Sequence, residues 1–581
     1  ALADLQSTTA PTDTDLDGMP DDWEDAVGYN KAVANNNVLL TAPQTAASFF
    51  PAGSPTGYTQ LEEYLHFMAV PHSMVAKNTS ISPSYIDIDL RKFTSGFTSS
   101  PTFTIANISN GSITQSGSGN AIVRFTPTLD ASGRAGFQFT VTDSTGDSWT
   151  QQCCLLISTK SQPRPVTWVG DGTTNNWDTT TANFTSLLGS TAFTTGDAVA
   201  INDTGSNIPT LKVIGALVPD SLTVSNTSKN FTLAGTGSLA ATGRFIKSGT
   251  GTLTIANTGP NAFSASSLEG GSLILSTTNA LGTSPITASN GTLAFSVDVA
   301  NPLVVNGAVA LSPSGSRTYN GAWSGAGSVQ INNTGSNLLT LVGAMSGFEG
   351  DVNFAASTGS ARLYGNAGSA AAAFDLGSGS INLYSRNGGS TFQLGSLSGG
   401  SGTKLSGTSS TTTPTTYNIG ALGTSTTFAG QIANGSQAAT ALTKIGSGVL
   451  TLTGTCTHTG ATTINAGTLA LLGTLGNSAV SIAANATLSG TGSCSGSVST
   501  AAGGAISPGA NNGDATGTLS VGSLNLTSPT LLFDLSSIPT SGNDRIQVTG
   551  TGAVTLSGTQ NFVFDRTDTV LSPGTLSLIH I

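Results

Sequence analysis

A nine-residue segment occurs twice in this chain, almost two hundred positions apart. Residues 247–255 read Lys-Ser-Gly-Thr-Gly-Thr-Leu-Thr-Ile, and residues 444–452 read Lys-Ile-Gly-Ser-Gly-Val-Leu-Thr-Leu. Related Gly-Ser/Thr-Leu strands follow at 271–275, 291–295 and 467–471, at steps of about twenty residues. A short strand between Gly-rich turns at this spacing is typical of one coil of a β-solenoid, which buries its inward side chains only by stacking on neighbouring coils.

Alternation within each repeated strand predicts which side chains face the interior. In the first copy, Leu253 and Ile255 are expected to point inward, while Thr252 and Thr254 face outward. A slip of one residue would turn every Thr into the core, so the register is well specified. An array of antiparallel β-sandwiches is the alternative fold, but sandwiches rarely space such similar strands so regularly.

Composition indicates a folded chain with a polar but nearly uncharged surface. Charged residues make up only 8% of the 581 residues, so Ser, Thr, Asn and Gly must form most of the surface. The net charge is −11 and no basic tract is available to contact phosphate groups, which argues against nucleic-acid binding. No apolar run approaches the ~20 residues that span a bilayer, so no membrane span is expected.

The sharpest chemical motif is an acidic segment at residues 13–24, which reads Asp-Thr-Asp-Leu-Asp-Gly-Met-Pro-Asp-Asp-Trp-Glu. It matches the twelve-position pattern of an EF-hand-like calcium loop, in which carboxylates at alternate positions converge on one hard cation and Gly18 permits the sharp turn. We therefore expect bound Ca²⁺, without which these acids would repel one another. An acidic, solvated linker is the alternative. The predicted ligands are side-chain oxygens and one backbone carbonyl, that of Met19: Asp13, Asp15, Asp17, Met19, Asp21 and Glu24.

Residues 57–66 predict a short amphipathic helix with Thr59 as N-cap and Glu62 completing a capping box. Together with the acidic loop, this segment resembles the calcium-loop region that follows the catalytic β-helix of secreted bacterial pectate-lyase-like polysaccharide lyases. The resemblance implies a neighbouring upstream domain that cleaves acidic glycans.

Residues 81–158 carry short alternating segments between turn clusters, a pattern typical of a β-sandwich. Phe137, Phe139 and Val141 are expected to line one face, and residues 143–147 to form the turn into the last strand. The segment resembles the immunoglobulin-like or cadherin-like domains of bacterial surface proteins.

A linker stiffened by Pro163 and Pro165 precedes the solenoid. Beyond it, the Trp168 and Trp177 segments, with the Lys-x-Gly-x-Gly-x-Leu-Thr signatures, resemble proteins with autotransporter-associated β-strand repeats. The resemblance implies a secreted or surface-exposed right-handed parallel β-helix. The two tryptophans are expected to cover the open core of the first coil, and a sugar-stacking platform is the alternative.

Catalytic and covalent sites are poorly supported by the sequence. The acids beyond Lys247 are scattered without repeating at coil spacing, and glycosidases need two carboxylates close together. Neighbouring Asp544 and Arg545 predict an ion pair within a turn. Unpaired thiols are expected for all four cysteines, because adjacent residues of a strand point to opposite faces and the other two lie almost two coils apart: Cys153, Cys154, Cys456 and Cys494.

The predicted domains are residues 1–78 with the calcium loop and short helices, 79–160 with the β-sandwich, and 161–581 with the solenoid, in a mainly β chain. We expect a non-catalytic, calcium-stabilised stalk, scaffold or adhesin region of a secreted or cell-surface bacterial protein, with a polysaccharide or the cell-surface matrix as partner. An unpaired edge strand at a solenoid end also permits self-association. The alternative is a solenoid that itself binds or degrades polysaccharide, so an enzyme role stays open.

Overall fold

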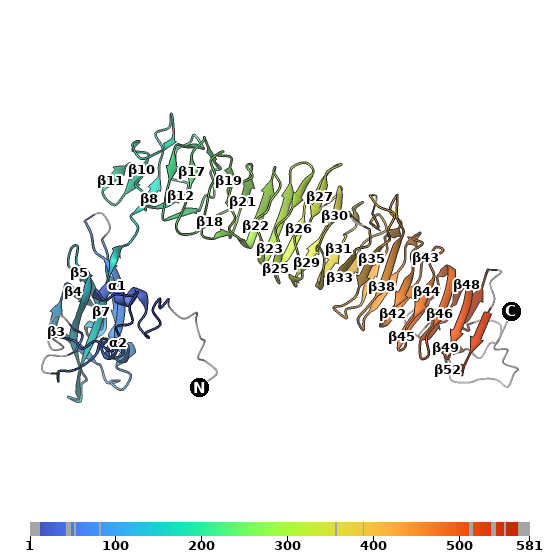
Figure 1. Cartoon of the computed structure of the whole chain (residues 1–581), viewed down its shortest axis with the longest axis horizontal. Coiled ribbons are helices and arrows are strands. Elements are labelled where there is room, and N and C mark those ends of the chain that lie inside the picture. The colour runs from blue at the N-terminus through green and yellow to red at the C-terminus, as the bar shows by residue number, and fades with distance from the viewer. Residues whose placement is uncertain are drawn as a thin grey trace. The chain divides into compact units, whose positions relative to one another are not determined.

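The chain folds into two compact units, Ala1–Pro165 and Val166–Ile581. The computed structural model describes residues 12–41, 48–50, 54–80, 83–354, 357–386, 388–408, 410–509, 515–535, 542–550 and 554–566 (Figure 1). Residues 1–11 of the predicted calcium-loop domain and residues 567–581 of the predicted solenoid lie outside the described residues. The division between the units falls at Pro165, within the segment predicted as a linker.

The first unit contains a β-sandwich and two short helices. A four-stranded sheet in the order β1-β7-β6-β3 and a three-stranded sheet in the order β2-β5-β4 enclose the core. Strand β1 is parallel to β7, and the other pairs are antiparallel. The element bounds are α1 (Asp21–Val27), α2 (Gln60–Ala69), β1 (His72–Lys77), β2 (Ile86–Asp89), β3 (Thr102–Ser109), β4 (Gly111–Ser116), β5 (Ile122–Pro127), β6 (Gly133–Thr142) and β7 (Ser148–Ser161), with short 3₁₀ turns at Leu90–Phe93 and Ser118–Asn120.

The sandwich core follows the predicted alternation along β6. Phe137, Phe139 and Val141 are buried together against residues of the facing sheet such as Val123 and Phe125. The turn between β6 and β7 closes where it was expected, since the Asp143 amide donates to the Asp147 carbonyl at 3.0 Å. These residues confirm an immunoglobulin-like sandwich built from half-buried alternating strands.

The outer face of the four-stranded sheet is covered by the N-terminal segment. Adjacent residues of β7 separate the two cores, because Cys153 belongs to the sandwich interior and Cys154 belongs to a second cluster. This confirms that the two thiols point to opposite faces. The second cluster joins residues of the acidic loop, both helices and β7: Met19, Trp23, Ala26, Phe49, Phe67, Cys154 and Leu156.

A buried ion pair fixes helix α2 to strand β6. The Arg134 guanidinium donates to both oxygens of Glu63 at 2.7 Å, and the Glu63 side chain is fully buried. Tyr29 adds a third bond, its hydroxyl donating to Glu63 at 2.6 Å, and the Phe49 amide donates to the same carboxylate at 2.7 Å. The helix itself begins with the predicted capping box of Thr59 and Glu62. Such a satisfied network specifies one docking geometry for the helix.

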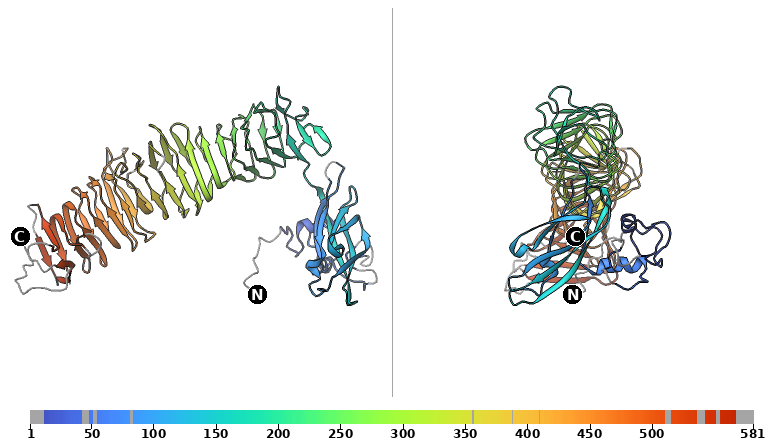
Figure 2. Two further views of the ribbon diagram at one scale, coloured as in Figure 1. Left: turned by 180° about the vertical axis from the view of Figure 1, so that it is seen from behind. Right: turned by 90° about the vertical axis from the view of Figure 1, so that its left-hand side faces the viewer.

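The second unit is a parallel β-solenoid, whose coils stack side by side in Figures 1 and 2. A thirty-stranded sheet that begins at β8 (Pro165–Trp168) runs through it to β51 (Val554–Ser557). Other sides of the coils are formed by a pair of strands, β14 (Ala216–Leu217) and β17 (Ser238–Leu239), and by two longer sheets. The first contains β24 (Arg317–Tyr319), β27 (Leu338–Leu341), β30 (Ser360–Leu363), β32 (Asn382–Ser385), β34 (Lys404–Ser406) and β37 (Gln431–Ala433). The second contains β36 (Thr426–Phe428), β39 (Val449–Leu452), β42 (Gly467–Leu471), β45 (Ala486–Gly490), β47 (Ala505–Pro508), β49 (Thr530–Leu535) and β52 (Asn561–Arg566).

Ladders of aliphatic residues run through the solenoid interior. Leu253 of β19 (Thr252–Ile255) pairs with Leu273 of β21 (Ser272–Leu275), which pairs with Leu293 of β22 (Ile286–Phe295). Leu253 and Ile255 are buried, whereas their neighbours Thr252 and Thr254 are partly exposed. The predicted alternation, register and twenty-residue coil are therefore confirmed, and the antiparallel-sandwich alternative is excluded for this unit.

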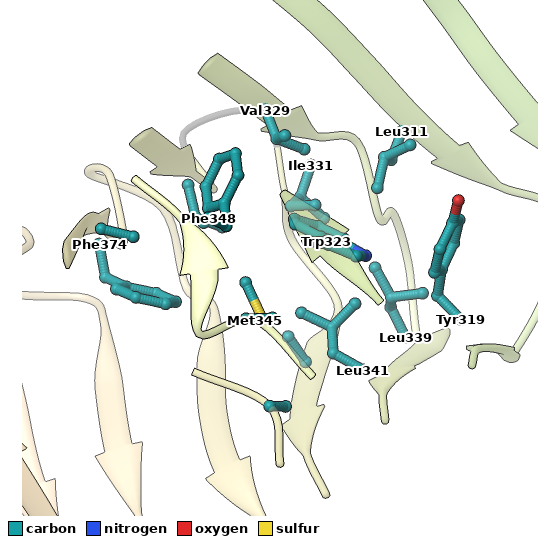
Figure 3. Packing of buried hydrophobic residues seen from close by; sticks show 14 of the residues in the cluster. Leu311, Tyr319, Trp323, Val329, Ile331, Leu339, Leu341, Met345, Phe348 and Phe374 are labelled. Carbon is teal, nitrogen blue, oxygen red and sulfur yellow. The ribbon is translucent and has the colours of Figure 1, made fainter. Parts of the chain in front are cut away.

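Aromatic side chains pack beside the aliphatic ones in the interior (Figure 3). Tyr319, Trp323 and Phe348 form a run of edge-to-face contacts, with ring centroids 5.8 and 5.7 Å apart. The Tyr319 hydroxyl is satisfied inside the core by the Asn301 carbonyl at 3.1 Å. The interior is thus a packed apolar core rather than an open channel.

The repeated lysine of the two nine-residue segments is buried, which the sequence did not predict. Lys247 ends β18 (Phe245–Lys247), and its ammonium donates to the carbonyls of residues 248, 249 and 270 at 2.6, 3.2 and 3.3 Å. Lys444 ends β38 (Thr440–Lys444) and makes the same three bonds at 2.8, 2.8 and 3.2 Å. Burial lowers the pKa of each lysine to about 8. The ammonium therefore ties the turn of one coil to the next coil.

Glycines of the same signature are required by close backbone approach. Gly446 has φ of +70°, and a Cβ there would lie 2.0 Å from the Gly420 carbonyl of the preceding coil. A side chain at this position would therefore force the two coils apart. The Lys-x-Gly-x-Gly pattern is explained by this turn, which has room for a lysine ammonium and for no Cβ.

The first coil is closed by aromatic side chains, as predicted. Trp168 and Trp177 are fully buried, and both rings contact Phe184 edge-to-face at centroid distances of 5.2 and 5.6 Å. Neither indole is available to stack on a sugar, so these residues do not form a sugar-binding platform.

The two cysteines of the solenoid lie in the same ladder of strands. Cys456 and Cys494 are free, and both pair with Leu475, which lies between them in the ladder.

The prediction of an Asp544–Arg545 ion pair is wrong: in the described part of the chain, the Asp544 carboxylate accepts from the amides of residues 517 and 534 at 2.7 and 2.9 Å. Asp544 is buried, and backbone donors satisfy it there, whereas Arg545 is exposed.

Candidate metal site

The acidic loop brings three of the six predicted ligands together directly. One carboxylate oxygen from each of Asp13, Asp15 and Asp17 lies within 4.8 Å of the other two. In the described part of the chain, no comparable group of three His, Cys, Asp or Glu ligand atoms occurs elsewhere. The loop therefore concentrates negative charge at one point of an otherwise charge-poor molecule.

Backbone amides of the loop hold two of these carboxylates in place. Asp13 accepts from the amides of Asp17 and Gly18 at 3.3 and 3.0 Å, and Asp17 accepts from the amide of Met19 at 3.0 Å. The turn requires positive φ at Leu16, +60°, and at Gly18, +94°. Gly18 has the conformational freedom that this turn needs, as the motif predicted.

Glu24 is drawn into the site from the first turn of α1. Its side chain is fully buried; Oε1 accepts from the Asn35 side chain at 3.0 Å, and Oε2 has no donor among the described residues. Both carboxylate oxygens of Asp15 are likewise buried without a donor within the described ranges. Loss of water and then the charge of Asp17 raise the pKa of Asp15, and burial raises the pKa of Glu24.

The buried oxygens without donors show whether these residues fit a cation. A buried carboxylate oxygen without a donor is costly, and several of them beside one another are more costly still. A hard divalent cation is satisfied by carboxylate and carbonyl oxygens of this kind. The donor set therefore fits Ca²⁺, and it contains no sulfur or imidazole ligand that would favour a softer metal.

Asp21 and Met19 lie in different surroundings from the three clustered aspartates. The Asp21 carboxylate accepts from the amide and the hydroxyl of Thr14, both at 2.7 Å. Its place in the site as a direct or water-bridged ligand stays a prediction. Met19 is fully buried, and its side chain belongs to the cluster on the outer face of the Ig sheet. The loop is thereby anchored to the sandwich through an apolar side chain.

A second segment of the chain contributes to the site, and the sequence prediction missed it. The Asn35 amide donates to Asp17 at 2.8 Å, and the Asn36 side chain donates to the Asp17 carbonyl at 3.0 Å. The only signal in the sequence is the run of three asparagines at residues 35–37. Asparagine is common in turns, so this run does not by itself indicate a metal site.

The loop is connected mechanically to the Ig domain through Trp23, the residue before Glu24. Its indole packs against Phe49, Tyr64 and Phe67 with centroid distances of 5.5, 5.2 and 4.9 Å. Because Phe67 lies on α2 and Trp23 on α1, the position of Glu24 is coupled to the packing of both helices on the sheet.

Within its described residues, the solenoid offers no second candidate site of this kind. His458 is fully buried, with one ring nitrogen 3.0 Å from the Thr462 hydroxyl, and burial lowers its pKa to about 4. A histidine held neutral in this way is part of the core. Among the described residues, no helix is long and apolar enough to cross a membrane.

Comparison with known families gives two matches. Residues 245–275 and 442–471 match the Passenger-associated-transport-repeat, and residues 70–154 match a bacterial Ig domain. The first repeat match runs from β18 to the end of β21, and the second runs from β38 to the end of β42. Each match therefore begins in the strand that carries the buried lysine. No curated protein and no solved structure matches the chain. The chain thus carries autotransporter-type passenger-associated repeats in a parallel β-solenoid, preceded by a bacterial Ig domain.

Proposed function

We propose that this chain is a non-catalytic, calcium-stabilised stalk or adhesin region of a secreted or cell-surface protein. The repeats and the Ig domain fit a cell-surface stalk or adhesin. The observation that carries the stalk role is the long ladder of parallel strands that follows the first coil, whose interior is filled by aliphatic and aromatic side chains. A solenoid of this type spans distance with a uniform cross-section, and its stability is a sum of coil-to-coil contacts.

Calcium is proposed for the N-terminal loop because both Asp15 carboxylate oxygens and Glu24 Oε2 are buried without donors among the described residues. Asp13, Asp15, Asp17 and Glu24 would hold the ion by their carboxylates. The bound ion would supply positive charge where four acids meet. Through Trp23 it would also hold α1 against the Ig sheet. The ion is thus proposed to stiffen the first unit rather than to take part in a reaction.

Calcium titration of the full chain after EGTA treatment tests this proposal. At free calcium 100 times the Kd, binding adds about 2.7 kcal/mol to the stability of the first unit. Thermal unfolding followed by tryptophan fluorescence should therefore shift upward with calcium. Glu24→Gln should abolish the shift, whereas Asp22→Asn, at the exposed position two residues earlier, should retain it. Absence of a shift in the unaltered chain would contradict the calcium proposal.

The partner proposed for the solenoid is a polysaccharide or the cell-surface matrix. A surface of hydroxyl, amide and backbone groups with 8% charged residues suits hydrogen bonding to uncharged groups. Binding of the full chain to neutral and acidic polysaccharides, with release of reducing ends measured in parallel, separates a binding stalk from the alternative of a degrading enzyme. Turnover would overturn the non-catalytic role.

A polysaccharide lyase domain is proposed as the neighbour of the calcium loop. This part rests on the resemblance of residues 17–24 and 57–65 to the segment that follows such domains, and neither family match reaches these residues. The DNA flanking the gene segment tests it, and flanking sequence that encodes an unrelated domain would refute it.

A further inference from the structure

Asn35 uses every one of its hydrogen-bond donors at the rim of the acidic loop. Its backbone amide donates to Asp17 at 2.8 Å, and its side-chain nitrogen donates to Glu24 at 3.0 Å and to the Asn30 carbonyl at 3.0 Å. The residue therefore bridges positions five and twelve of the loop, although it follows the loop by eleven residues.

The side-chain oxygen of Asn35 takes no part in these hydrogen bonds. Asn35 Oδ1 is buried and has no donor among the described residues. An amide oxygen normally accepts a hydrogen bond, and leaving a buried one unmade is unfavourable. Since Oδ1 and the side-chain nitrogen are bonded to the same carbon, the unsatisfied oxygen lies beside the atom that holds Glu24.

Three residues in and beside the acidic loop carry buried oxygens that have no donor among the described residues. These oxygens are the two carboxylate oxygens of Asp15, Glu24 Oε2 and Asn35 Oδ1. Glu24 is fully buried, and the Asn35 bond occupies its other oxygen, which leaves Oε2 as the free one. Calcium takes six to eight oxygen ligands, including side-chain amide carbonyls. A neutral amide adds a ligand without adding to the repulsion among four carboxylates.

We propose that Asn35 supplies its side-chain carbonyl as an additional ligand to the cation, so that the site is built from two segments, residues 13–24 and Asn35. This inference rests on the proposed calcium site. Glu24 then coordinates the cation through Oε2, and the hydrogen bond from Asn35 to Oε1 fixes the orientation of its carboxylate. The ligands thus include one residue from outside the twelve-residue loop.

The second segment connects the ion to helix α2. Asn36, the next residue, accepts from the Leu61 amide through its carbonyl at 3.2 Å, and the Val38 carbonyl accepts from the Gln60 amide at 2.9 Å. Gln60 and Leu61 form the first turn of α2. Coordination by Asn35 thus ties the cation to the start of the helix that the Arg134–Glu63 pair holds on the Ig sheet.

Isothermal titration of the full chain with CaCl₂ after EGTA treatment tests the ligand role. Asn35→Ala should weaken calcium binding by about 10–100-fold, the usual effect of removing a supporting group at a metal site. Asn35→Asp keeps an oxygen at the ligand position but loses the donor to Glu24, so it should bind calcium more tightly than Asn35→Ala. Asn37→Ala, an exposed asparagine two residues later, is the matched control and should change the Kd by less than about twofold.

Each outcome bears on a different claim. No heat of calcium binding in the unaltered chain overturns the calcium site itself. Normal binding by Asn35→Ala overturns the role of Asn35. Equal weakening of Asn35→Ala and Asn35→Asp also overturns the ligand role, because it shows that Asn35 acts only by donating to Glu24. Far-UV circular dichroism at saturating calcium establishes that each variant is folded.

Discussion

Replacement of the buried lysine of the repeat, Lys444→Met, tests whether its ammonium is desolvated in the turn between two coils. Lys444 is 1% exposed, and among the described residues its ammonium bonds to three carbonyls and to no carboxylate. Methionine keeps the apolar stem and removes the donors. The comparison therefore isolates the ammonium from the packing of the side chain.

The expected magnitude follows from the lysine's pKa. Burial lowers it from 10.5 to about 8, a difference equivalent to about 3 kcal/mol against the charged form in the folded chain. At pH 7 the variant is relieved of this cost, but it leaves three carbonyls without donors at ~1 kcal/mol each. The two effects nearly cancel, so the stability of the variant at pH 7 should lie within about 1 kcal/mol of the unaltered chain.

The difference should grow with pH in a defined direction. Between about pH 8 and 10.5 the unfolded chain binds the lysine proton and the folded chain does not, so the stability of the unaltered chain rises with pH through this window. Lys444→Met lacks this gain. The variant should therefore be less stable than the unaltered chain by about 3 kcal/mol at pH 10.5. Taking the difference removes the contributions of other groups that titrate in both proteins.

Urea unfolding followed by far-UV circular dichroism at pH 7 and 10.5 measures both differences. Lys212→Met, at an exposed position of β13 (Thr210–Val213), is the control for loss of a lysine as such. A stability difference between Lys444→Met and the unaltered chain that is the same at both pH values would refute the reasoning, because it would mean that the ammonium is not desolvated in the turn.

Three further outcomes are expected. Arg134→Met leaves the fully buried Glu63 without its cation and should destabilise the first unit by about 3–5 kcal/mol, seen as a lower thermal midpoint; an unchanged midpoint would show that the pair is dispensable. Leu469→Ala should cost the solenoid about 2–5 kcal/mol in urea unfolding, whereas Thr468→Ala on the outward side should cost less than about 0.5 kcal/mol. A thiol reagent should label none of the four buried cysteines in the native chain and all four after denaturation, and rapid native labelling would contradict their burial: Cys153, Cys154, Cys456 and Cys494.

The parts of the fold that were predictable from the sequence depend on local periodicity. Leu253 and Phe139 point inward because alternate residues of a strand share a face, and Thr59 caps α2 because the capping box is a contact between residues three apart. The convergence of Asp13, Asp15 and Asp17 is similarly local. Each of these needs only a few consecutive residues to be read correctly.

The parts that escaped prediction depend on contacts between distant segments. Lys247 is placed in the interior by carbonyls of two successive coils, and no rule of composition puts an unpaired lysine there. Asn35 reaches the acidic loop because residues 28–38 fold back beside it. Asp544 turns away from Arg545 because backbone amides of residues 517 and 534 satisfy it better than an exposed neighbour.

The direction of the strand pairing determines how the solenoid responds to tension. Each strand bonds to its equivalents one coil earlier and one coil later, so a pull on the two ends of this unit strains the outermost coil before the others. Coils are then peeled off singly, and each frees about twenty residues, or roughly 65 Å of extended polypeptide. The coils that stay paired keep an intact edge on which a detached coil can rewind. We therefore expect this solenoid to yield stepwise under load, as an extensible tether would, and to recover its length when the load is released.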